Sequence, residues 1–259
     1  MRALRFPWFA LLPLALLALW QGLATGGLIP TGIVPEPVLV ARSWHKWVFG
    51  DPGMGLSPYS GTWVANVTYS ARRVLQGFAI AALIGVPVGL LIGWSLRVSK
   101  IVDPTIQMFR PIPITAWVPF AVAVFGIYDA NALFLISLGA FYPIVVNATH
   151  GVRDTNPLLL RAARMMGASR ADVLFRVVFP SALPAVFTGL RLGIGVAWTA
   201  VIVAEMVAVK SGLGYVLWDA YYVNRMDICV ATMASIGLLG FVSDRIVVAI
   251  SQFVLRWRN

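Results

Sequence analysis

The chain has 259 residues, of which 59% are hydrophobic and only 12% are charged. Soluble globular domains carry about 25% charged residues, so this composition excludes an ordinary soluble domain. Lysine and arginine total 20 against 10 aspartate and glutamate residues. Basic residues in membrane proteins collect in cytoplasmic loops, so we interpret the excess as a record of orientation and not as nucleic-acid binding.

The first apolar run, Trp8–Ala24, follows Arg2 and Arg5. Cleaved signal peptides share this charged start, but the small-residue cleavage pattern is weak here, so residues 1–25 predict a retained first transmembrane helix. Residues 26–71 mix proline and glycine with tryptophan. This composition prevents a long helix and suits a membrane interface, and it predicts an extracytoplasmic connection with short interfacial helices.

Residues 72–259 form the predicted core, with five further spans of the apolar character that a bilayer crossing needs. They are Val74–Trp94, Ile114–Ile127, Ala130–His150, Pro184–Val207 and Ile228–Ala249. The fold class is therefore an all-α integral membrane protein with about six transmembrane helices. The span at Ile114 is short, so it must extend back through Pro104–Pro113 or be broken there.

Orientation follows from the basic residues. Placing both termini in the cytoplasm puts most of them inside, as the positive-inside rule requires. The pair Arg72–Arg73 then falls outside, and snorkelling to the interface is the account that the sequence offers for it.

Small residues recur at four-residue spacing in two spans, which keeps them on one helix face. Such faces let membrane helices approach closely. The predicted helix-packing residues are Gly77, Gly85, Gly89, Gly93, Gly189 and Gly193. Packing in any membrane bundle explains them, so they identify no function.

The cytoplasmic loop 156–184 is more structured than a tether needs. Asn156 followed by Pro157 predicts a helix start, and Gly167 predicts its end. Ser169 with Asp172 forms a capping box that starts a second helix, which we expect to run to Phe179 and to be ended by Pro180 and Pro184. The first helix has an apolar face. This face is compatible with docking in a groove of a partner protein or with lying on the inner membrane surface, and the residues alone favour neither interpretation.

This loop resembles the conserved loop of bacterial ABC importer permeases, in which Glu-Ala-Ala is followed after three residues by Gly and after nine more by Ile-x-Leu-Pro. Here the matching residues are Ala162-Ala163, Gly167 and Val177-x-Phe179-Pro180, with Arg161 in place of the glutamate. By this resemblance, the residues that couple to an ATPase are Leu158, Arg161, Ala162, Ala163, Arg164, Met166, Gly167, Ala168 and Pro180.

The resemblance extends from about Val67 to Trp257. The stretches RPIPITAWVPFAVAVFGI (110–127), GASRADVLFRVVFPSALPAVFTGLRLGIGVAW (167–198) and AEMVAVKSGLGYVLWDA (204–220) are similar to the nitrate, sulfonate, taurine and bicarbonate branch of these permeases. It implies a type I importer permease fold with a cytoplasmic coupling helix, in a multi-pass protein of the bacterial inner membrane that transports a small anionic solute.

The implied partners are two cytoplasmic ABC ATPase subunits, a second permease copy in a homodimer, an extracytoplasmic solute-binding protein and membrane lipid, with no nucleic acid. ATP and Mg²⁺ are expected on the ATPase and no cofactor in this chain. A phosphate-binding loop needs a lysine after glycine. The only lysines, Lys46, Lys100 and Lys210, do not follow one.

Candidate residues of the substrate pathway are Arg110, Trp117, Trp198 and Glu205. Arg110 is expected either to contact an anionic substrate or to snorkel to the inner headgroups. Arg191 is expected either to snorkel or to brace the loop 156–184. Glu205 fits pairing with a basic residue such as Lys210 or a place in the cavity wall, because an ionisable residue in a span is costly without a role.

Two other functional classes are less consistent with the sequence. An ion-driven secondary transporter usually shows internal repeats and intramembrane carboxylates, and here Glu205 is the one acidic residue well inside a predicted span. A membrane enzyme would need a catalytic group with a base or a metal site, and the spans contain no such arrangement in sequence.

Overall fold

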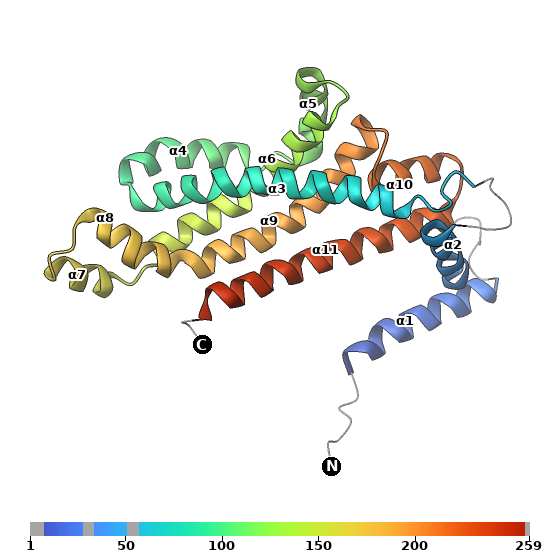
Figure 1. Cartoon of the computed structure of the whole chain (residues 1–259), viewed down its shortest axis with the longest axis horizontal. Coiled ribbons are helices and arrows are strands. Elements are labelled where there is room, and N and C mark those ends of the chain that lie inside the picture. Colours follow the sequence, from blue (N-terminus) through green and yellow to red (C-terminus); the bar gives the residue numbers. More distant parts are fainter. Residues whose placement is uncertain (1–7, 28–33, 51–56, 257–259) are drawn as a thin grey trace, which may run out of the picture. The chain divides into compact units, whose positions relative to one another are not determined.

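The computed structural model describes residues 8–27, 34–50 and 57–256 (Figure 1). The chain divides into two compact units. The first unit comprises residues up to Val67 together with Val216–Ser235, and the second unit comprises Thr68–Tyr215 and the residues from Ile236 onward. Three helices, α3, α10 and α11, continue from one unit into the other.

The described elements are α-helices joined by short turns. In chain order they are α1 (Trp8–Thr25), α2 (Pro37–Phe49), α3 (Trp63–Trp94), α4 (Leu96–Phe109), the 3₁₀ turn η1 (Ile114–Trp117), α5 (Val118–Phe125), α6 (Asp129–Arg153), α7 (Pro157–Met165), α8 (Arg170–Val173), the π-helical turn η2 (Leu174–Val178), α9 (Phe179–Ala208), α10 (Leu213–Tyr222) and α11 (Met226–Val254).

Within the described residues, four helical segments are long and apolar enough to cross a bilayer: α3, α6, the continuous helix 170–208 and α11. A fifth candidate is the pair formed by α4 and η1–α5, which is bent by 91°. The break expected in this span is therefore confirmed. The first predicted span corresponds to α1, a shorter apolar helix, and its crossing of the membrane stays a prediction.

Two predicted boundaries are wrong. The connection predicted for residues 26–71 does contain a short helix, α2, but α3 already begins inside it at Trp63. The second helix of the 156–184 loop does not end at Phe179. It continues through Pro180 and Pro184 into α9.

The π turn explains this continuity. The N–H of Phe179 bonds to the carbonyl of Leu174, five residues back. Proline has no N–H and its ring crowds the preceding turn, and a widened turn makes room for both effects. The helix therefore tolerates Pro180 where an unbroken α-helical turn would not.

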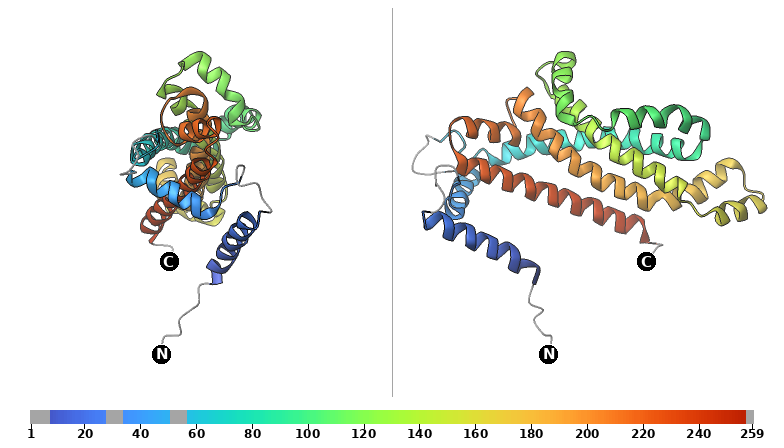
Figure 2. Two further views of the ribbon diagram at one scale, coloured as in Figure 1. Left: turned by 90° about the vertical axis from the view of Figure 1, so that its right-hand side faces the viewer. Right: turned by 180° about the vertical axis from the view of Figure 1, so that it is seen from behind.

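In the second unit, α6 is the helix against which both α3 and α9 pack, and α6 and α9 run alongside each other (Figure 2). A methyl group built on Gly89 would lie 2.6 Å from the Ala148 Cβ and from the Val145 carbonyl oxygen of α6. All six predicted packing glycines face α6 at short range: Gly77, Gly85, Gly89 and Gly93 from α3, and Gly189 and Gly193 from α9.

We expect Gly89→Ala to destabilise the protein by about 1–3 kcal/mol, because the added methyl has to displace helix backbone. Gly195→Ala is the matched control, because a methyl built on Gly195 meets no atom within 4 Å. Thermal unfolding of both variants in one detergent compares them. Equal melting temperatures would show that α3 and α6 need no close approach.

The first unit is held by polar contacts. Ser43 of α2 donates to Asp227 at 2.6 Å, and Arg225 pairs with the same carboxylate at 2.8 Å. Tyr59 donates to Asp219 at 2.7 Å, and its burial beside that carboxylate raises the pKa of the phenol above its ordinary range.

Candidate coupling and pathway sites

The loop 156–184 forms a hairpin in which both helix starts are capped by side chains. The Asn156 side-chain oxygen accepts from the N–H of Leu158 at 2.9 Å. Ser169 and Asp172 form the reciprocal capping box. Between them Gly167 has a φ of +80°, the left-handed conformation that favours glycine. The predicted caps and turn are confirmed.

The hairpin, here residues 156–173, has one packed face and one exposed face. Ala163 is buried with Val152, Val173 and Ala182, so α7 is fixed to the ends of α6 and α9. On the other side Leu158 and Met166 are exposed, the methionine at 81%. An exposed apolar face on a helix that is fixed in place is typical of a binding surface for another molecule.

The nine residues assigned to coupling therefore separate into two groups. Ala163, Ala168 and Pro180 are buried or half-buried, and the two alanines pack in the cluster that fixes the hairpin to α6 and α9. The exposed group comprises Leu158, Arg161, Ala162, Arg164, Met166 and Gly167. Only this second group is available to a partner.

The bent span carries Arg110 and Trp117. Arg110 ends α4 and is exposed at the break. The Trp117 ring contacts Phe109, Phe120 and Phe134, with centroids 5.9–6.4 Å apart. Its indole nitrogen is enclosed and donates to no acceptor within the described residues. A buried donor without an acceptor is costly, so the indole N–H has unused hydrogen-bonding capacity.

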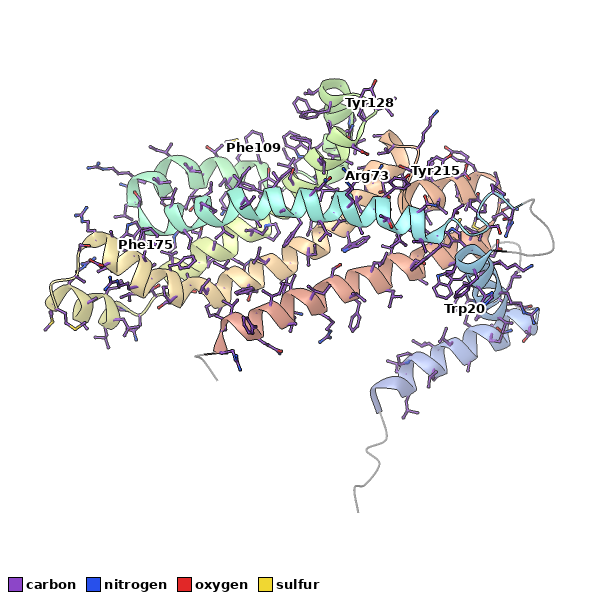
Figure 3. All side chains as sticks on the ribbon, viewed as in Figure 1. Trp20, Arg73, Phe109, Tyr128, Phe175 and Tyr215 are labelled. Carbon is purple, nitrogen blue, oxygen red and sulfur yellow. The ribbon has the colours of Figure 1, made fainter. Side chains whose placement is uncertain are left out.

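Glu205 lies in a cluster that the sequence did not reveal, the Arg73 cluster, formed by Ser70, Arg73, Asp129, Glu205 and Ser211. Arg73 is on α3 (Figure 3) and is only 5% exposed. It bonds Glu205, Asp129 and both oxygens of Ser211, each at 2.8 Å. Four guanidinium N–H groups thus donate hydrogen bonds, and Asp129 adds an ion pair.

The same cluster fixes the start of α10. Glu205 accepts from the backbone N–H of Gly214 at 2.9 Å, and Ser70 accepts from that of Leu213 at 2.8 Å. Gly212 has a φ of +105°, and a methyl built on it would lie 2.3 Å from the Glu205 carboxylate. Helices α3, α6, α9 and α10 are thus joined at one charge network, in which Arg73 and Glu205 are buried and Asp129 is exposed.

Three expectations are corrected here. Arg73 does not snorkel, because it is buried and paired with Glu205. The pairing of Glu205 with a basic residue is confirmed, but its partner is Arg73 and not Lys210. Arg191 binds Asp244 of α11 through two bonds of 2.8 and 3.0 Å, so its partner lies on α11 and it does not brace the hairpin.

The four candidate pathway residues lie in different surroundings. Arg110 and Trp117 are on either side of the break in the bent span. Trp198 is 5% exposed, and its indole N–H donates to Ser243 of α11 at 3.1 Å. Trp198 therefore packs α9 against α11, and Glu205 is enclosed in the Arg73 cluster. The one signal in the sequence was the pair Arg72–Arg73 on the side of the membrane that the positive-inside rule disfavours, and it named no partner for Glu205.

Known proteins resemble the chain over most of its length. Residues 85–256 match the family described as binding-protein-dependent transport system inner membrane component. A putative ABC transporter permease of Methanocaldococcus jannaschii is 40% identical over 77% of this chain and 75% of its own length.

Two relatives have substrates in their names. A putative aliphatic sulfonates transport permease of Bacillus subtilis is 30% identical over 98% of this chain and 90% of its own length. A nitrate import permease of Synechocystis is 32% identical over 93% of this chain and 86% of its own length.

The fold is also that of a solved transporter subunit. A chain in inward-facing structures of the MetNI methionine ABC transporter has a TM-score of 0.64 and 18% identity, and the match covers 76% of this chain and 95% of that one. The chain has the type I importer permease fold.

Proposed function

This chain belongs to the binding-protein-dependent transport system inner membrane components, and we propose that it forms the pathway for a small anionic solute and couples solute transport to separate ATPase subunits through the hairpin 156–173. It is a multi-pass membrane permease of the ABC importer class and not an enzyme. Two copies, two cytoplasmic ATPases that bind ATP and Mg²⁺, and an extracytoplasmic binding protein make up the proposed assembly, with both termini in the cytoplasm.

The observation that carries the coupling role is the two-faced hairpin. Its inner face is fixed by the buried Ala163, and its outer face exposes Leu158 and Met166. A helix held rigidly on the spans can transmit a movement of a bound partner to them as a rigid body. Because α8 continues through η2 into α9, a displacement of the hairpin passes directly into a membrane-spanning helix.

An anionic substrate is supported by the bent span. Irregular backbone within a membrane is tolerated where it borders a cavity, and here the break lies between Arg110 and Trp117. Arginine and an unused indole N–H are both suited to an oxyanion. The sulfonate and nitrate named for two relatives are small oxyanions.

We expect the purified chain to hydrolyse no ATP by itself, and ATPase activity to require the partner subunits encoded with it. Reconstituted vesicles with the binding protein should take up solute only with internal ATP, and uptake should survive dissipation of the ion gradients. ATP hydrolysis by this polypeptide in isolation would refute the proposal. Uptake that persists without ATP but collapses with an ion gradient would establish a secondary transporter instead.

A further inference from the structure

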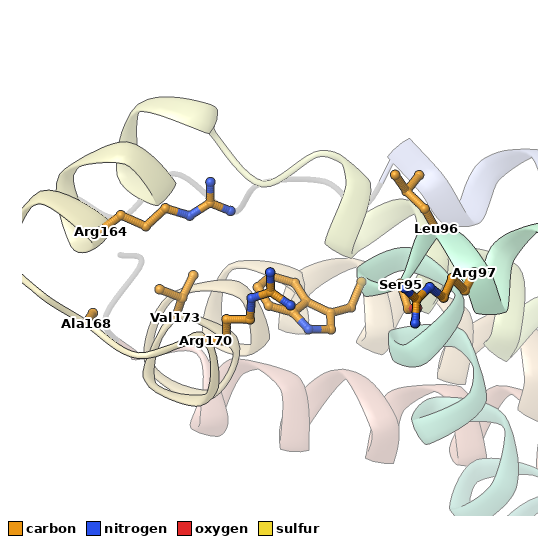
Figure 4. A pocket seen from close by; sticks show the side chains of 8 residues that line it. Ser95, Leu96, Arg97, Arg164, Ala168, Arg170 and Val173 are labelled. Carbon is orange, nitrogen blue, oxygen red and sulfur yellow. The ribbon is translucent and has the colours of Figure 1, made fainter.

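A basic cavity of about 860 Å³ lies between the hairpin and the turn that joins α3 to α4. Arg164 and Arg170 enter it from the hairpin, and Arg97 from the first turn of α4 (Figure 4). The remaining lining residues are Trp94, Ser95, Leu96, Ala168 and Val173. None of these lining residues, all from the described part of the chain, carries a carboxylate side chain.

The three arginines differ from the paired arginines of the second unit. Arg73, Arg153 and Arg191 each bind a carboxylate at 2.8 or 2.9 Å. Arg97, Arg164 and Arg170 form no ion pair with any residue in the described ranges 8–27, 34–50 and 57–256. Like charges brought together without a counter-charge repel one another, so the cavity favours an anionic occupant.

An apolar groove of about 240 Å³ adjoins this cavity. Trp94 lines both, and from there the groove follows the last turns of α3 along Leu90 and Pro87. Its opposite wall is formed by Leu174, Phe175 and Phe179 of η2 and α9, and Phe175 is 68% exposed (Figure 3). In the proposed orientation α3 runs from Trp94 into the bilayer, so the groove leads away from the basic cavity toward the acyl chains.

We propose that the cavity and the groove together bind one anionic phospholipid of the inner leaflet. The phosphate lies among Arg97, Arg164 and Arg170, and an acyl chain follows the groove past Leu90 and Leu174. Arginine clusters on the cytoplasmic side of membrane helices suit phosphate headgroups, and the tryptophan at the junction suits the interface. An acidic surface of a protein would satisfy the arginines but would leave the apolar groove without a role.

This inference rests on the proposed function only for the orientation of the chain in the membrane. Binding of the lipid also has a consequence for the hairpin. Arg164 and Arg170 belong to the segment proposed to dock the ATPase, and Arg97 belongs to α4. A phosphate bound to all three arginines would link the hairpin to the α3–α4 turn. The lipid therefore stabilises the position of the hairpin in which it docks to the ATPase.

The test measures phospholipid retained by the full-length permease after purification, using native mass spectrometry with phosphatidylglycerol and phosphatidylcholine supplied in equal amounts. We expect the unaltered protein to retain phosphatidylglycerol selectively. Arg97→Gln and Arg170→Gln should each lower its retention about fivefold, because each arginine near an anionic headgroup contributes a similar increment. Arg256→Gln, a basic residue outside the cavity, is the matched control.

A groove variant separates a lipid from a free anion. Leu174→Trp fills the apolar wall and should reduce retention of phosphatidylglycerol with the three arginines intact. If Leu174→Trp has no effect and inorganic phosphate displaces whatever is bound, the cavity is a phosphate site and the lipid proposal fails. If Arg97→Gln weakens binding of the ATPase and leaves lipid retention unchanged, the occupant is a protein surface. Neither outcome affects the ATP dependence of uptake, which tests the permease function separately.

Discussion

Arg73→Gln is expected to destabilise the protein by about 3–5 kcal/mol, because it leaves a buried carboxylate without its counter-charge. Glu205 is fully buried, and its oxygens are shared among Arg73, Ser70 and the N–H of Gly214. Glutamine at position 73 supplies too few donors and no charge. Unfolding in detergent, followed by intrinsic tryptophan fluorescence, measures the difference from the unaltered chain.

Arg72→Gln is the control for this prediction. The neighbouring arginine is exposed, so its removal should change the free energy of unfolding by less than about 0.5 kcal/mol. The double variant Arg73→Leu/Glu205→Leu removes both charges and should recover much of the lost stability, since an apolar pair can replace a buried ion pair. Equal effects of the two single arginine variants would show that the Arg73 cluster contributes no stability.

The sequence located the membrane spans because an apolar run is a local property of the chain. An apolar run predicts a helix without knowledge of its neighbours, and caps such as Asn156 or Ser169 act within three residues. The Arg73 cluster is different. It joins residues that are 132 positions apart, so only packing brings them together. The positive-inside rule treated Arg73 as a loop residue, and burial overrode that interpretation.

The same distinction explains the error at Pro180. Proline after a capped helix predicts an end, because the statistics of helix ends are local. Here η2 widens the turn before Pro180, and Val173, Val178 and Ala182 are buried in one cluster that also includes Ala163 of α7. Packing against α6 and α7 thus stabilises a continuous helix where the sequence alone favours a break. That continuity links the hairpin to α9.

Gly167→Val is expected to reduce solute uptake about tenfold relative to ATP hydrolysis, because a left-handed residue other than glycine costs about 1–2 kcal/mol. The reason is conformational and not steric. Gly167 has a φ of +80°, and a methyl built there meets no atom within 4 Å. A β-branched residue would favour another conformation of the turn and so displace Met166 and Arg164. The turn is closed by a hydrogen bond from the N–H of Gly167 to the carbonyl of Arg164.

Gly167→Asn distinguishes this mechanism from a clash with the partner. Asparagine tolerates the left-handed conformation better than other residues with a Cβ, and it is similar in size to valine. If the turn geometry governs coupling, the asparagine variant should keep most of its uptake while the valine variant loses it, at equal amounts in the membrane. If both lose uptake equally, bulk at this position is what the ATPase groove rejects. If both transport normally, the hairpin is not the coupling element, since its turn could then change shape without consequence for transport.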